Sequence, residues 1–190
     1  CHCVSVKVHN FRGGHSGVDA NVYRANAIMV AARIGLQGAK NGGQLCCMKG
    51  GSAHNAIPMD ASFCMNFDND EAAQKFVAIA NELGKKIVHE YKDTDPNGAV
   101  EAEKKCGCCC CEKCTFVDNA ETLKIFRGLV SYPSSVLRMS PVVKGLTESS
   151  VNLGQFKYCA CEGGEFTMLT RSSIMSFLES FNEQLEALTL

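Results

Sequence analysis

The sequence predicts an α+β fold of two layers, in which helices cover one face of a largely antiparallel sheet. Segments with apolar residues at every second position alternate along the chain with segments of helical spacing. The order strand, helix, strand, strand, helix occurs twice in the 190 residues. We therefore expect a single domain over 1–190, with lobes at about 1–95 and 96–190.

The chain begins with a predicted strand, a glycine-rich turn and a helix. Residues 2–9 place valines on one face and polar residues on the other, as in a half-buried strand. After the turn, Asp19 or Asn21 is suited to cap a helix that runs to about Gln37. A short strand is expected at 44–49.

The rest of the first half combines a loop, a strand and a long helix. Gly50 and Pro58 bracket the loop, and aromatic and methionine residues alternate over 63–67. Residues 70–92 predict an amphipathic helix, because their apolar positions recur every three or four residues. These positions are Phe76, Ile79, Ala80, Leu83 and Ile87. The turn at 95–98 divides the halves.

The second half repeats this order without repeating the sequence. We expect a strand within 99–117, a helix from Asp118 to Ser131 with Glu121 in a capping-box position, and extended segments across 142–161. The remaining expected elements are a hairpin turn at 162–164, a strand at 165–171 and a last helix capped by Ser172 or Ser173.

Composition narrows the possible functions. A formal net charge of −1 argues against general nucleic-acid binding, which requires a basic excess. No apolar run approaches the roughly 20 residues that span a bilayer, so we expect no membrane partner. The 13 cysteines are odd in number and bunched, whereas a secreted disulfide framework favours an even, spaced set. We expect a reducing, cytoplasmic location.

Residues 106–114, with the sequence CGCCCCEKC, form the densest group of cysteines. The pairs Cys108/Cys111 and Cys111/Cys114 have the Cys-x-x-Cys spacing that holds zinc or an iron–sulfur cluster. Cysteine also packs as a small apolar residue, and the run would then only fill a covered strand. We favour packing and expect no metal ligands in this chain, while keeping a cysteine-rich metal-binding or interaction module as an alternative.

Three separate residues indicate a polar site for an anionic or amide-bearing ligand. His15 stands among glycines in RGGHSG (12–17), Asn55 precedes Ala-Ile-Pro, and Arg171 closes a strand. Each also has a structural interpretation: a turn histidine, an Asx turn, and a cation that offsets local acidic charge. No metal-ligand pattern such as His-Glu-x-x-His accompanies them.

Taken together, RGGHSG, NAIP (55–58), ESSVNLG (148–154) and TRSS (170–173) resemble the lid domain of the aminoacyl-histidine dipeptidases. These enzymes belong to the dizinc peptidase family that also holds the carnosinases. The resemblance extends over nearly the whole chain in motif order, and the cysteine-rich 106–114 departs from it. It implies a ferredoxin-like lid enlarged by a second βαββα unit.

The resemblance also implies a function. The catalytic domain, absent from this chain, would carry two zinc ions and a general-base glutamate. His15 would stabilise the oxyanion, often across a homodimer, Asn55 would hold the substrate backbone, and Arg171 would clamp the terminal carboxylate. Asn152 is a weaker candidate, expected to bond the backbone instead. The implied activity is hydrolysis of Xaa-His dipeptides, with the isolated lid inactive; a pure oligomerisation module is a further alternative.

Overall fold

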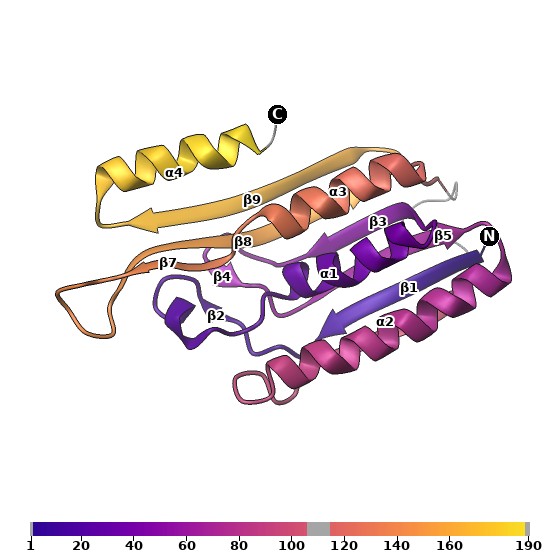
Figure 1. Ribbon diagram of the computed structural model, residues 1–190, viewed down its shortest axis with the longest axis horizontal. Coiled ribbons are helices and arrows are strands. Elements are labelled where there is room, and N and C mark those ends of the chain that lie inside the picture. The colour runs from indigo at the N-terminus through magenta and orange to yellow at the C-terminus, as the bar shows by residue number, and fades with distance from the viewer. Residues whose placement is uncertain (1, 106–114, 189–190) are drawn as a thin grey trace.

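A computed structural model describes residues 2–105 and 115–188 of the chain. Its centre is a seven-stranded sheet with the order β6-β1-β5-β3-β8-β7, in which β9 also pairs with β8 (Figure 1). Every pairing in this sheet is antiparallel. The strands are β1 (His2–His9), β3 (Gln44–Gly50), β5 (Ala61–Phe67), β6 (Ala99–Lys105), β7 (Ser135–Met139), β8 (Thr147–Cys159) and β9 (Gly163–Ser172).

Three helices pack on one face of this sheet and enclose the core (Figure 1). They are α1 (Ala27–Lys40), α2 (Asp70–Glu90) and α3 (Asn119–Ser131). A fourth helix, α4 (Met175–Ala187), lies along β9 and buries no residue completely. The predicted α+β sandwich is confirmed, and the two halves of the chain contribute to one continuous sheet.

The alternation in the first strand determines which face of the sheet meets the helices. Val4 pairs with Met65 and Val6 with Phe63, and all four side chains belong to the core. Successive residues of a strand point to opposite faces. Ser5 and its neighbours at odd positions therefore face away from α1 and α2, and this second surface is called the open face below.

The first helix begins later than the sequence predicts. Asp19 and Asn21 flank or lie within a single 3-10 turn, Ala20–Val22, and α1 starts at Ala27. Asn26 is the actual cap, because its Oδ1 accepts hydrogen bonds from the backbone N–H groups of Ile28 and Met29 at 3.0 and 3.3 Å. The Nδ2 of Asn26 also donates to Leu153 O, which attaches the start of α1 to β8.

The second half differs from expectation in its loops. Strand β7 was not predicted, and residues 142–146, expected to be extended, belong to the connection before β8. The last helix starts at Met175, and neither Ser172 nor Ser173 caps it with a side chain. Ser172 Oγ instead accepts a hydrogen bond from Ile174 N, the residue before the helix. Asp118 caps α3 as predicted, by accepting from Glu121 N at 2.8 Å.

Two helical glycines provide a matched test of core packing. A Cβ on Gly35 would lie 2.7 Å from Cδ1 of Phe126, and closer still to two other ring atoms, whereas a Cβ on Gly128 would meet nothing within 4 Å. We expect Gly35→Ala to lower the free energy of unfolding by about 1–3 kcal/mol through overpacking. Gly128→Ala should raise it by about 0.5–1 kcal/mol, because alanine favours the helix. Urea unfolding measures both, and a stabilised Gly35→Ala would contradict the packing of α1 on α3.

None of the helices in residues 2–105 and 115–188 combines the length and apolar content that crossing a bilayer requires.

Candidate functional site

The His15 turn is held in a conformation that requires glycine. His15 and Gly14 form the short strand β2 (Gly14–His15), which pairs with β4 (Ala56–Ile57) in a separate two-stranded sheet. Gly14 has φ of 142°, a region that residues with a side chain rarely adopt. A Cβ there would lie 2.6 Å from Asp19 Oδ2, so no larger residue fits.

Hydrogen bonds orient the imidazole of His15. Its Nδ1 accepts from the backbone N–H groups of Gly17 at 3.2 Å and Val18 at 3.1 Å. Its own backbone N–H donates to Asp19 Oδ2 at 2.8 Å. Because Nδ1 is an acceptor, the neutral ring carries its proton on Nε2. The turn-forming role and a donor role are therefore compatible, since each uses a different ring nitrogen.

Arg171 lies beside this turn although 156 positions separate it from His15. It stands near the end of β9, opposite Ser150 of β8. His15 Cε1 and Arg171 Cδ both lie 3.3 Å from the position that a Cβ of Gly17 would occupy. The missing side chain of Gly17 thus leaves room for both groups, and the fold brings together two of the three predicted residues.

Asn55 belongs to the segment that runs next to the His15 turn. Its backbone carbonyl accepts from Ser16 N at 3.0 Å, and its side chain is exposed. Asn152 of β8 holds the segment in place and is only 3% exposed. Its Nδ2 donates to His54 O at 3.1 Å and to Ala56 O at 2.8 Å. This bonding confirms the expected backbone-binding role of Asn152.

Gly154 explains part of the ESSVNLG segment. A Cβ at this position would lie 2.6 Å from His54 O and 2.9 Å from Ala53 O. Only glycine allows β8 to approach the Asn55 segment this closely. Asn152 and Gly154 of the ESSVNLG segment therefore position the Asn55 segment and do not themselves supply reactive groups.

Removing the amide of Asn152 should loosen the site. We expect Asn152→Asp, which keeps the size but loses the N–H donors, to lower the free energy of unfolding by about 1–3 kcal/mol, because the buried Asn152 side chain loses both of its hydrogen bonds to the backbone. Hydrogen exchange at the Ser16 amide should also accelerate. Chemical denaturation and exchange mass spectrometry measure these effects. Asn97→Asp, the same substitution at an exposed turn position, is the control, and equal stability of Asn152→Asp and the unaltered protein would contradict the bracing role.

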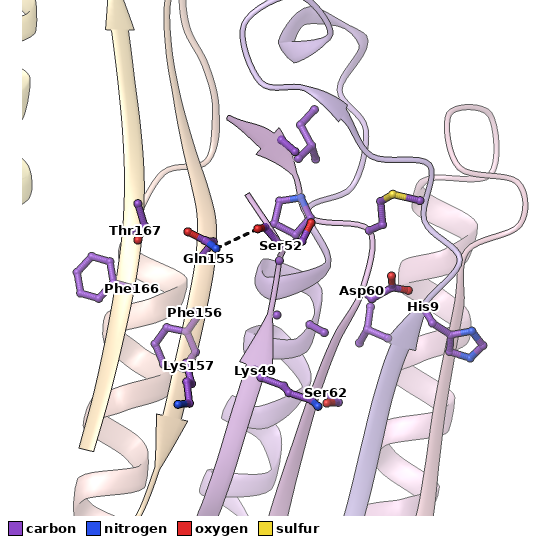
Figure 2. Close-up of a pocket in the computed structure, with 18 of the residues that line it drawn as sticks. His9, Lys49, Ser52, Asp60, Ser62, Gln155, Phe156, Lys157, Phe166 and Thr167 are labelled. Carbon is purple, nitrogen blue, oxygen red and sulfur yellow. Dashed lines mark hydrogen bonds between the residues drawn. The ribbon is translucent and has the colours of Figure 1, made fainter. Parts of the chain in front are cut away.

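A cavity of about 930 Å³ lies on the open face of the sheet next to Gly14, and His15, Asn55 and Arg171 are not among the residues that line it. Gly14 and Ala56 contribute to its lining, so the cavity is continuous with the β2–β4 pair. Figure 2 shows Gln155 reaching across it toward Ser52, whose carbonyl accepts from Gln155 Nε2 at 3.1 Å. A small polar ligand would fit in a cavity of this size.

Strand register arranges the charges of this cavity in a row. Lys7 lies opposite Ser62, Ser62 opposite Lys49, and Lys49 opposite Lys157, across β1, β5, β3 and β8; Figure 2 labels the last three of these residues. Glu101 lies opposite Lys7 on its other side and Glu165 opposite Lys157, so the row carries acidic as well as basic charge. The sequence gives no local signal for this row, because only the register places its members side by side.

The arginines Arg24, Arg138 and Arg171 differ in whether an acidic side chain of the protein engages them. Arg24 is engaged by Asp19, at 3.5 Å, and by Gly13 O, at 2.6 Å. Arg138 is paired with Glu148 at 2.7 Å. Within the described residues, no carboxylate forms a salt bridge with Arg171. Its guanidinium can therefore receive a carboxylate from a ligand.

Ligands for a pair of catalytic zinc ions are not among the described residues. In that part of the chain, the one group of histidine, cysteine or acidic side chains with atoms close enough to share an ion consists of Cys3, Cys46 and Cys64. Dizinc hydrolytic chemistry uses imidazole and carboxylate ligands with an open position for water. The predicted cysteine site at 106–114 lies outside the described residues.

Comparison with known proteins identifies the fold. No family model matches the chain, and no curated protein matches its sequence. Among solved structures, the chain superposes on aminoacylhistidine dipeptidase from Vibrio alginolyticus with a TM-score of 0.88 and 24% identity, over 98% of this chain and 37% of that one. An amidase of the hydantoinase/carbamoylase family from Burkholderia multivorans gives a TM-score of 0.39 and 16% identity, over 55% of this chain and 27% of that one.

The fold is therefore that of an α+β sandwich present within a larger hydrolase structure. One structure with this fold over 98% of the chain is the aminoacylhistidine dipeptidase from Vibrio alginolyticus. Our chain spans 37% of that protein's length.

Proposed function

We propose that this chain is the lid and dimerisation domain of a zinc-dependent dipeptidase that hydrolyses Xaa-His dipeptides. The observation that carries the proposal is the meeting of His15 and Arg171 at Gly17, next to the Asn55 segment. A hydrogen-bond donor and a free guanidinium side by side match the carbonyl and the terminal carboxylate of a dipeptide. The fold shared with a dipeptidase over 98% of the chain supports it.

In this proposal His15 acts on the scissile carbonyl. Its Nε2–H donates to the carbonyl oxygen and binds more strongly as that oxygen becomes a tetrahedral oxyanion. The two backbone bonds to Nδ1 hold the ring, so little reorganisation is needed when charge develops. The donor comes from this chain, whether it serves its own subunit or the other subunit of a homodimer.

Arg171 and Asn55 are proposed to position the substrate. The planar guanidinium binds the terminal carboxylate through two parallel hydrogen bonds. The carboxamide of Asn55 holds the polar backbone of the dipeptide.

The rest of the proposed enzyme belongs to a catalytic domain outside this chain. That domain would hold two zinc ions, which supply an activated water when bound. As a lid, the 190-residue chain would be inactive in isolation and would take part in catalysis only together with that domain. The proposed enzyme is a homodimer in a reducing cytoplasm.

The test is the activity of the full-length protein that contains this chain. Purified with zinc, it should hydrolyse a series of Xaa-His dipeptides faster than the matching Xaa-Ala dipeptides. It should lose activity after chelation and regain it with added zinc, while the 190-residue chain shows none. Preference for Xaa-Ala would overturn the histidine specificity, and no hydrolysis of any dipeptide would overturn the enzyme class.

A further inference from the structure

Three buried thiols meet at the end of the sheet where the chain begins. The Sγ atoms of Cys3, Cys46 and Cys64 all lie within 4.8 Å of one another. Each residue is at most 1% exposed, and together they form a cluster separate from the main core. They come from the three adjacent strands β1, β3 and β5.

Strand register places the three thiols on one face of the sheet. Cys3 and Cys64 occupy alternate positions that face away from the helices, whereas Leu45 and Met65 are paired in the core. Cys46 follows Leu45 and therefore faces the same side as Cys64. A β-bulge follows, because the register of β3 against β5 shifts between Leu45 and Cys47, and Cys46 has no partner position in β5.

We propose that Cys3, Cys46 and Cys64 together bind one thiophilic d¹⁰ metal ion, Zn²⁺ or Cu⁺, through three thiolates. With metal–sulfur bonds of about 2.3 Å, three thiolates around one ion stand about 4 Å apart. All three Sγ atoms lie within 4.8 Å of one another, so at most small rotations of the side chains are needed to complete the site. Soft thiolate ligands select these ions over Mg²⁺ or Ca²⁺.

A bound cation compensates part of the thiolate charge in this location. Binding releases three thiol protons to solvent and leaves three thiolates around one cation. Three buried thiolates without a cation would be strongly unfavourable. Amide side chains border the group: Asn66 Oδ1 accepts from His2 N at 3.2 Å and from Cys3 Sγ at 3.9 Å, and Asn66 Nδ2 donates to Gln44 Oε1 at 3.2 Å. The bond from the Cys3 thiol to Asn66 is given up when Cys3 binds the metal as a thiolate.

This site is distinct from the zinc ions of the proposed function. It lies among β1, β3 and β5, and its ligands are sulfur. Its role is to cross-link three strands, so the inference stands or fails independently of the dipeptidase activity.

Metal stoichiometry tests the proposal. The full chain, purified without an affinity tag and reduced, is loaded with Zn²⁺ alone or Cu⁺ alone, desalted and analysed by elemental mass spectrometry. Compared with the unaltered chain, Cys46→Ala and Cys64→Ala should each lose one equivalent of metal, and the double variant should lose that same single equivalent. Cys159→Ala, which removes a buried strand cysteine outside the group, should retain it.

A second measurement covers variants that fail to fold. In the unaltered chain, bound metal should slow alkylation of Cys3, Cys46 and Cys64 together, and a chelator should reverse this protection. Retention of metal by Cys46→Ala and Cys64→Ala would overturn the proposal. So would alkylation of the three cysteines that proceeds equally with and without metal. Binding of Zn²⁺ alone or Cu⁺ alone by the three thiols identifies the ion.

Discussion

Replacing His15 by alanine in the full-length protein is expected to lower kcat by about 10²–10³-fold, the typical loss when one oxyanion donor is removed. The reason is the orientation of the ring. Its Nδ1 accepts from the backbone of Gly17 and Val18, so Nε2–H is the hydrogen-bond donor that the ring can offer to a ligand. Because the loss concerns the transition state, kcat should fall more than KM rises. Steady-state kinetics on an Xaa-His dipeptide measures it.

The same contacts require a control, because His15→Ala also removes a side-chain acceptor from the turn. Asparagine at this position can accept from the backbone N–H groups two and three residues later, as in an Asx turn. His15→Asn should therefore keep the stability of the turn, while its Nδ2 donor, on a shorter side chain, no longer reaches the position of the imidazole Nε2. We expect His15→Asn to be nearly as slow as His15→Ala, with bound zinc unchanged in both and thermal stability lowered only in His15→Ala. Near-normal turnover of His15→Asn would show that the histidine only shapes the turn.

Individual strands and helices were predictable from the sequence where the apolar residues followed a single strand or helix periodicity. The alternating valines of β1 and the spaced apolar residues of α2 each predict their element directly. The start of α1 was not predictable, because Asp19, Asn21 and Asn26 are all acceptable caps. Asn26 is used because it also reaches Leu153 O on a strand more than a hundred residues away.

The sequence was sufficient to select the residues of the candidate site, but not to predict which of them lie close together in space. RGGHSG and Asn55 stand out through their glycine and proline neighbours. Nothing local indicates that Arg171 meets Gly17, because the contact depends on how β9 pairs with β8. The three-thiol cluster was missed for the same reason. Cys64 stands alone in the sequence, and the strand register that brings it beside Cys3 and Cys46 has no local signal.

Arg171→Ala is expected to raise KM for free dipeptides by roughly 10- to 100-fold, the loss that corresponds to about 1.5–3 kcal/mol for hydrogen bonds to a charged group. The same variant should change KM little for dipeptides with an amidated C-terminus, which present no carboxylate. The physical basis is that Arg171 has no salt-bridge partner among the described residues and lies beside His15. Comparing KM for each dipeptide and its amide measures the effect.

Two further variants separate a carboxylate clamp from a general effect of charge. Arg127→Ala removes an exposed cation of α3, on a helix that does not contribute to the site, and should leave both KM values unchanged. Arg171→Lys keeps the charge but replaces a planar fork with a single ammonium, so it should recover only part of the affinity for the free dipeptide. Equal losses on free and amidated dipeptides in Arg171→Ala would contradict the clamp. They would instead assign Arg171 a structural role, because its side chain also packs against Gly17.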